Sequence, residues 1–104
     1  MNLEIKKIVS LKASLVSDTI THSGIIENLS RDSLYLRAVK INPASDFTPG
    51  EFLEIHLQSN SGEDISLPGK VMWSYDTPPH GLTKSIGIKI SEENPDYEEL
   101  FRNI

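Results

Sequence analysis

The chain has 104 residues, a formal charge of −5 and no cysteine. This length suits one ordinary domain, and the lack of cysteine excludes a disulfide framework, a thiol nucleophile and a cysteine-ligated zinc site. The negative charge disfavours non-specific nucleic-acid binding, and no apolar run is long enough to cross a membrane. We therefore expect one cytoplasmic domain over residues 1–104, with no membrane or nucleic-acid partner.

Apolar and polar residues alternate with a period of two along most of the chain, which is the pattern of half-buried β-strands. In chain order we predict strands at residues 9–15, 21–28 (with a weaker pattern), 34–37, 53–58, 65–75 and 86–90. The fifth strand has the clearest pattern and places Trp73 and Tyr75 on its apolar face. We therefore expect Trp73 in the core or at a barrel mouth with its N–H hydrogen-bonded. The alternative is that Trp73 is a stacking platform for a base.

Turn residues separate these strands. Residues 48–51, Thr-Pro-Gly-Glu, have proline and glycine at the central positions that a type II turn prefers. Residues 59–62 predict a hairpin loop, and residues 77–81, which include two prolines, predict another loop. Pro68 cannot donate to a β-ladder, so we expect a bulge or an edge position there.

The period changes only near the end of the chain. Asn94 and Pro95 are typical of a helix N-cap and first helical position. The apolar residues that follow recur at helical spacing and form one stripe: Tyr97, Leu100, Phe101 and Ile104. A helix this short is not stable alone, so we expect it to dock on the strands or to plug an opening. Six strands and one helix predict an all-β antiparallel barrel or compact sandwich.

The sequence contains no recognisable catalytic or metal-binding motif. His22, His56 and His80 lack the spacing of metal ligands, and a surface or loop position is expected for each. There is no Gly-x-Ser-x-Gly elbow and no glycine-rich phosphate cradle. We therefore predict a non-enzymatic protein without catalytic residues, metal or cofactor. A single-strand nucleic-acid binder would need a basic groove with exposed aromatic side chains, which a charge of −5 and 7% aromatic residues disfavour.

Several segments, taken in order, resemble the PilZ domain family. Residues 24–36 resemble its signature, in which a strand enters an Asp/Asn-x-Ser-x-x-Gly turn and leaves as an apolar strand. Three later segments agree in order: 49–55 with the family's glycine turn and middle strand, 67–73 with its Gly-x-Val-x-Trp strand, and 85–90 with its Gly-Val-x-Phe strand. The resemblance implies a six-stranded antiparallel β-barrel of the split-barrel type with a short C-terminal α-helix.

The resemblance also implies a ligand. PilZ domains are bacterial receptors for cyclic di-GMP, which they bind with an Arg-x-x-x-Arg segment before the first strand and with the Asp/Asn-x-Ser-x-x-Gly turn. An arginine fork can bind phosphate or guanine bidentately. By position, the binding residues here would be Lys7, Lys12, Asn28, Ser30, Arg31 and Ser33.

This sequence departs from the family pattern at two points. Ser33 stands where glycine is expected, and no arginine precedes Arg31. Lys7 and Lys12 are not four residues apart, so at most one of them can replace an arginine of the pair. A Cβ at position 33 costs about 1 kcal/mol if the backbone there needs a positive φ.

These departures lead to two functional hypotheses. The first is a non-catalytic PilZ-like adaptor with lost or very weak cyclic di-GMP binding that acts through protein contacts, as family members without these motifs do in pilus or motility machinery. Tyr35, Phe47 and Phe52 are candidate contact residues, because each is expected off the main apolar face. The alternative is a functional cyclic di-GMP receptor that uses the Asn28-x-Ser30 turn and nearby basic residues.

Overall fold

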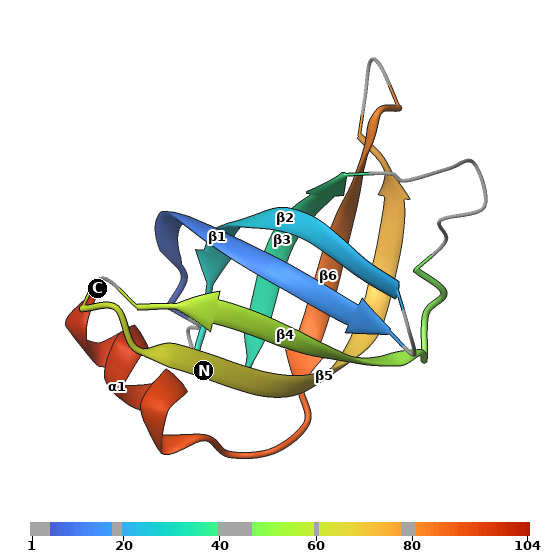
Figure 1. The fold of residues 1–104 in the computed structure, drawn as a ribbon. Helices are drawn as coiled ribbons and strands as arrows, with labels where there is room; N and C mark the ends of the chain where they lie inside the picture. The colour runs from blue at the N-terminus through green and yellow to red at the C-terminus, as the bar shows by residue number, and fades with distance from the viewer. Residues whose placement is uncertain (1–4, 18–19, 40–46, 60, 78–80) are drawn as a thin grey trace.

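Six antiparallel strands close into a barrel, with one α-helix at the C-terminal end of the chain (Figure 1). A computed structural model describes residues 5–17, 20–39, 47–59, 61–77 and 81–104. The elements are β1 (Lys7–Ser17), β2 (Ile20–Leu29), β3 (Ser33–Val39), β4 (Phe52–Gln58), β5 (Asp64–Asp76), β6 (Thr83–Ile90) and α1 (Pro95–Asn103). Around the barrel the order is β1-β2-β3-β6-β5-β4, and pairing of β1 with β4 closes it. The predicted six-stranded antiparallel barrel with a short C-terminal helix is confirmed.

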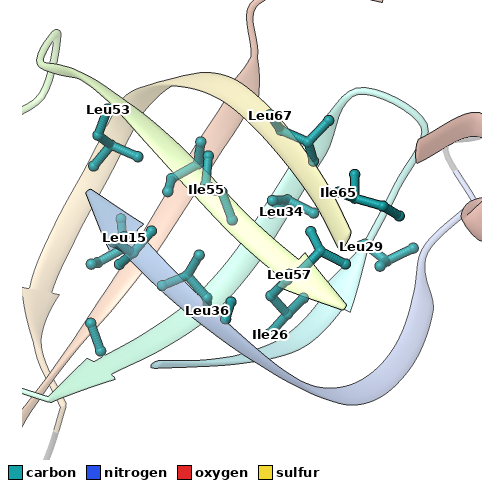
Figure 2. Packing of buried hydrophobic residues seen from close by; sticks show 14 of the residues in the cluster. Leu15, Ile26, Leu29, Leu34, Leu36, Leu53, Ile55, Leu57, Ile65 and Leu67 are labelled. Atoms are coloured by element: carbon teal, nitrogen blue, oxygen red, sulfur yellow. The ribbon is translucent and has the colours of Figure 1, made fainter. Parts of the chain in front are cut away.

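The core fills the inside of the barrel with aliphatic side chains from alternate positions of every strand (Figure 2). Side chains with no exposed surface come from all six strands: Leu15 lies in β1, Ile26 and Leu29 in β2, Leu36 in β3, Ile55 in β4, Leu67 in β5 and Ile86 in β6. Because the outer positions of the same strands carry polar residues, the period of two in the sequence corresponds to the inner and outer faces of the barrel.

The predicted turn at residues 48–51 has the expected geometry. Gly50 adopts φ of +94° at the third position of the turn, and the Glu51 N–H donates to the Thr48 carbonyl at 2.9 Å. A positive φ at that position defines a type II turn and favours glycine. In the β4–β5 hairpin loop, Gly62 likewise adopts a positive φ, and its N–H donates to the Ser59 carbonyl.

Pro68 lies inside β5 without disrupting the ladder. Its carbonyl accepts a hydrogen bond from the Ser91 N–H at 3.0 Å, on the side away from β4. The nitrogen and carbonyl of one residue in a strand point to the same side, so the missing N–H costs no bond with β4. Pairing with β6 starts only at Gly69. The predicted edge position is therefore realised locally, where β5 has a strand neighbour on one side.

A bulge in β5 changes which face its last residues occupy. The β5–β6 register shifts between Val71 and Trp73, and such an extra residue reverses the alternation of side chains beyond it. Trp73 and Tyr75 are therefore on the outer surface, 38% and 49% exposed, while the Ser74 hydroxyl donates to the Phe47 carbonyl. The prediction that Trp73 and Tyr75 lie on the buried face is wrong, because counting by twos assumes an unbroken strand.

Two ring side chains are more buried than predicted. His22 was expected on the surface or in a loop, but it is buried in β2, with its ring centroid 4.8 Å from that of Phe47. Phe47, expected off the main apolar face, belongs to the core. His56 is exposed on β4 and pairs with Glu54 at 2.7 Å, as a surface position predicts, whereas His80 lies outside the described residues.

Helix α1 covers one end of the barrel (Figure 1). The Asn94 side chain caps it by accepting from the Tyr97 N–H at 3.0 Å, and Asn94 also donates to the Ser66 carbonyl of β5 at 3.2 Å. Tyr97 and Leu100 are buried in the core cluster, and Phe101 packs against it. The predicted cap, apolar stripe and docking of the helix are confirmed. In the described part of the chain, no helix has the length and apolarity needed to cross a membrane.

Candidate functional site

The turn between β2 and β3 contains three of the six predicted site residues, and two of them bond to each other. The Ser30 N–H donates to the Ser33 carbonyl at 2.9 Å, and the two hydroxyl oxygens lie 2.5 Å apart. Ser30 is 1% exposed. Because the two hydroxyls hydrogen-bond to each other, the Ser30 side chain closes the turn and presents no group to solvent.

Helix α1 also contacts this turn. The Tyr97 hydroxyl donates to the Ser30 carbonyl at 2.5 Å. Burial, followed in size by the nearby negative charge of Asp32, raises the pKa of Tyr97 well above the usual tyrosine value. The phenol therefore remains protonated and able to donate at physiological pH.

Lys7 is also directed to the helix rather than to the turn. Its ammonium group donates to the Phe101 carbonyl near the C-terminal end of α1 and lies 4.6 Å from the centroid of the Phe101 ring. A cation is favourable at that end of a helix, where the backbone carbonyls are unpaired. The predicted phosphate contact for Lys7 thus competes with a contact that fixes the helix.

Asn28, Arg31 and Lys12 differ from these residues, since their side chains are not engaged. None of the three forms a side-chain hydrogen bond or ion pair with the described part of the chain, and all three are at least partly exposed. Asn28 pairs with Ile8 of β1 and with Tyr35 of β3, while Lys12 lies further along β1, opposite Ile25. The structure therefore brings Asn28, Ser30, Arg31 and Ser33 together. It places Lys7 opposite Leu29, with its ammonium group on α1, and leaves Lys12 further along β1.

The serine at position 33 does not strain the turn. Ser33 is the first residue of β3 and pairs with Lys89 of β6. Extended backbone suits any L-residue, so the expected penalty for a Cβ at a left-handed position does not arise. The Ser33 hydroxyl instead supplies the partner of Ser30.

Beside the turn, on the outer face of β3, β6 and β5, Tyr35, Trp73 and Tyr75 form what we call the aromatic cluster. The Trp73 ring centroid lies 5.4 Å from that of Tyr35 and 5.5 Å from that of Tyr75, on which it stacks at 18°. The two tyrosine hydroxyls are 3.5 Å apart, and this contact is the largest cause of a raised pKa at Tyr75.

Gly87 of β6 makes room for the indole. A Cβ there would lie 2.2 Å from Trp73 Cε2 and 2.4 Å from its Nε1, so the ring rests directly on the strand backbone. The alternation of residues missed this cluster because of the bulge. The available signal was Gly87 itself, since glycine inside a strand often marks a close approach.

A large hollow lies apart from the β2–β3 turn. Its volume is about 1150 Å³, and it lies over β1 and its neighbouring strands, where its lining includes Lys12, Glu27 and Arg37. Glu27 and Arg37 form an ion pair at 3.1 Å. None of the β2–β3 turn residues lines it. In the described residues, no group of three or more histidine, aspartate or glutamate side chains is placed to hold a metal ion.

Comparison with protein families gives a clear result. The model of the PilZ domain matches residues 8–104. The chain belongs to the PilZ family. PilZ domains are receptors for cyclic di-GMP and are typically non-catalytic binding modules. A search of curated protein sequences finds no match.

A solved PilZ protein shares this fold. The chain is similar to the Bacillus subtilis inhibitor of motility, MotI/DgrA, with a TM-score of 0.75 and 12% sequence identity. The likeness covers 98% of this chain and 48% of that one, so the chain spans about half the length of the solved protein. At this identity the likeness establishes the barrel and its helix, and the predicted fold class is confirmed.

Proposed function

We propose that this PilZ domain is a cytoplasmic signalling module that binds cyclic di-GMP weakly or not at all and acts through contacts with a protein partner. The observation that carries the proposal is the state of Ser30, whose hydroxyl is buried and paired with Ser33 at 2.5 Å. A hydroxyl that contacts a ligand must be accessible to it. Here the same atoms stabilise the turn on which α1 docks.

The cations support the same conclusion. No arginine precedes Arg31 in the chain, and Lys7 is held by the Phe101 carbonyl. Lysine lacks the planar fork that binds a phosphate or a guanine with two parallel hydrogen bonds. Each charged hydrogen bond is worth about 1.5–3 kcal/mol. Loss of an arginine pair therefore weakens binding by at least about a hundredfold.

The partner is sought by analogy with the solved protein of the same fold, which is described as an inhibitor of motility. This description supports a search among the proteins of motility or pilus machinery. The aromatic cluster supports protein contacts in general, because exposed apolar clusters on folded domains are common at interaction sites.

Calorimetric titration of the chain with cyclic di-GMP tests the proposal. We expect no binding at micromolar concentrations. The variant Ile8→Arg, Lys12→Arg, Ser33→Gly restores the missing groups, because Ile8 is 89% exposed opposite Asn28 and Lys12 is exposed on the same strand. We expect this variant to gain affinity.

The matched control is Ile8→Lys, Ser33→Gly, which has the same charge as the restored variant but no guanidinium fork. If the control binds as tightly as the arginine variant, charge alone limits binding and the fork argument is wrong. Micromolar binding by the unaltered chain would refute the proposal.

A second function, a working cyclic di-GMP receptor, is favoured by one observation. The side chains of Asn28 and Arg31 have no hydrogen-bond or ion-pair partner in the described residues. They could therefore contact a guanine and a phosphate without breaking a contact of the fold. If the unaltered chain binds the dinucleotide, Asn28→Ala and Arg31→Ala should each weaken binding about tenfold or more, whereas Lys6→Ala serves as an exposed control.

A further inference from the structure

The outer face of β3, β6 and β5 presents large aromatic side chains to solvent in a fixed arrangement. Trp73 and Tyr75 are exposed by the bulge in β5, and the third ring, Tyr35, comes from β3 across Gly87. Each ring is within about 5.5 Å of a neighbouring ring. Stacked rings lose little conformational freedom on binding, and aromatic residues are the usual anchors of protein interfaces.

The outward position of Trp73 requires two sequence features that are not needed to form the core. A bulge must turn Trp73 outward, and position 87 must lack a Cβ because the indole lies on the backbone. With Trp73 inside the barrel the same atoms would be buried and would add to the core. The sequence therefore maintains an exposed indole at a cost in hydrophobic burial.

Positive charges surround this cluster although the chain as a whole is acidic. Lys70 and Lys89 are exposed and lie directly opposite each other on β5 and β6, and Lys89 is two residues along β6 from Gly87. Like charges directly opposite on neighbouring strands destabilise a sheet. A negatively charged partner would relieve that repulsion.

Arg37 adds a third cation on the opposite side of the cluster. It pairs with Ser85 of β6, which in turn pairs with Tyr75 of β5. Glu27 neutralises part of its charge at 3.1 Å. Asp76, which follows Tyr75, is paired with Lys84 at 3.2 Å, and this pair adds no net charge. Further exposed carboxylates lie on the α1 segment, at Glu92, Glu93, Asp96, Glu98 and Glu99. The aromatic cluster is therefore a cationic region on an anionic molecule.

The closed barrel limits how a partner can bind. The central strand of this face, β6, pairs with β3 on one side and with β5 on the other, so it offers no free edge. A partner cannot add a strand to β6 through backbone hydrogen bonds. Docking on this face therefore uses side chains, which makes anchors and charge complementarity the source of affinity.

We infer that this face is the docking surface for an acidic protein segment that carries an aromatic or large aliphatic side chain. The apolar side chain packs against Trp73 and its two tyrosine neighbours, and the carboxylates face Lys70, Lys89 and Arg37. This inference rests on the proposed function, a module that acts through protein contacts, and it names the surface and the chemistry of the partner.

Selection of random twelve-residue peptides displayed on phage against the whole chain tests the inference. We expect enrichment of acidic peptides that contain an aromatic or large aliphatic residue. A selected peptide without tryptophan is then synthesised, and its binding is followed by emission of Trp73, the chain's single tryptophan. Binding should change that emission and weaken as salt increases.

Labelled-peptide anisotropy measures the variants. Trp73→Ala should weaken binding at least about tenfold, and the double variant Lys70→Glu, Lys89→Glu should do the same without touching the aromatic cluster. Ile20→Ala and Lys6→Glu, which change an exposed aliphatic residue and an exposed lysine elsewhere, should leave affinity unchanged. The charge variant keeps the test valid if Trp73→Ala alters the fold.

Enrichment of basic or neutral peptides, absence of enrichment, or affinity in the Trp73 and lysine variants equal to that of the unaltered chain would overturn the inference. These outcomes are distinct from failure of the proposed function, which is decided by calorimetry with cyclic di-GMP. If the chain binds both the dinucleotide and the acidic peptide, the docking surface is supported and only the proposal of weak nucleotide binding is wrong.

Discussion

The barrel end covered by α1 and the outer face of β3, β6 and β5 differ in how their aromatic side chains are placed. At the barrel end under α1, Tyr97 is buried and its hydroxyl, like that of Ser30, is used inside the protein. On the outer face, Trp73 and Tyr75 remain exposed. The same small barrel thus buries one aromatic side chain in the fold and leaves others exposed to solvent.

This contrast shows that a family motif can persist for a structural reason. The serine of the Asn28-x-Ser30 turn remains, but here its hydroxyl meets Ser33 and its carbonyl receives Tyr97. Replacing Ser30 would therefore remove the hydroxyl contact with Ser33 that stabilises the turn, even if no ligand ever binds. The presence of the turn motif alone does not establish a nucleotide site.

The largest effect that separates the two regions is expected from truncating one ring in each. Tyr97→Ala leaves a cavity and an unpaired Ser30 carbonyl, and it should lower the free energy of unfolding by about 3–5 kcal/mol. Trp73→Ala removes packing at a half-exposed position and should lower it by about 1 kcal/mol. Urea denaturation of both variants measures the difference. Equal losses would mean that the aromatic cluster is part of the core in energetic terms.

Alkaline pH should weaken the helix end selectively. The pKa of Tyr97 is raised in the folded protein, chiefly by burial, so above about pH 10 the unfolded chain loses this proton first. The stabilising contribution is complete below pH 10 and falls as pH rises, by up to about 1.4 kcal/mol per pH unit. Tyr97→Phe should cost about 1 kcal/mol at neutral pH and should remove this slope.

Denaturation at pH 7 to 11 compares the two proteins. The other tyrosines are present in both, including Tyr75, whose pKa is also raised. The difference between the two curves therefore reports Tyr97 alone. Parallel curves across the alkaline range would show that the Tyr97 hydroxyl is not buried as described.

The elements of the fold were predictable because their signals are local. Alternation of residues located all six strands, and Asn94 with Pro95 located the start of the helix. Gly50 indicated a type II turn because the third residue of such a turn, and no other residue in it, requires a positive φ. Each of these signals depends on a few neighbouring residues and on backbone sterics.

The site was harder to predict because its contacts join distant segments. Lys7 and Phe101 meet only once the barrel is closed and α1 has docked on it. A single extra residue in β5 reversed the side of Trp73, and nothing near Met72 in the sequence marks the bulge. The resemblance to the family placed Ser30 correctly in the turn, but the contact of its carbonyl with Tyr97 joins residues far apart in the chain.

The cap of α1 is expected to show a smaller effect on the same end of the barrel. Asn94→Ala removes the acceptor of the Tyr97 N–H and the donor to the Ser66 carbonyl. The free energy of unfolding should fall by about 1 kcal/mol, the usual value for an N-cap. Asn94→Asp keeps the cap but not the donor, and should recover most of the loss. A loss in Asn94→Asp as large as in Asn94→Ala would assign the effect to the Ser66 contact.

The smallest effect on the free energy of unfolding is expected from Gly87→Ala, which should nevertheless displace the Trp73 indole. The new Cβ would lie 2.2 Å from the indole, so Trp73 must leave the strand and the stacked arrangement with Tyr75 is lost. Two opposing terms nearly cancel: lost ring packing of about 0.5–1.5 kcal/mol and relief of glycine's conformational cost within a strand, about 0.5–1 kcal/mol. Near-UV circular dichroism and Trp73 emission should change, while the denaturation midpoint stays nearly constant. Lys89→Ala is the neighbouring control, since its side chain points outward without touching the rings. A Gly87→Ala protein with unchanged spectra would show that the indole does not rest on β6, and that the outer face has no rigid aromatic anchor.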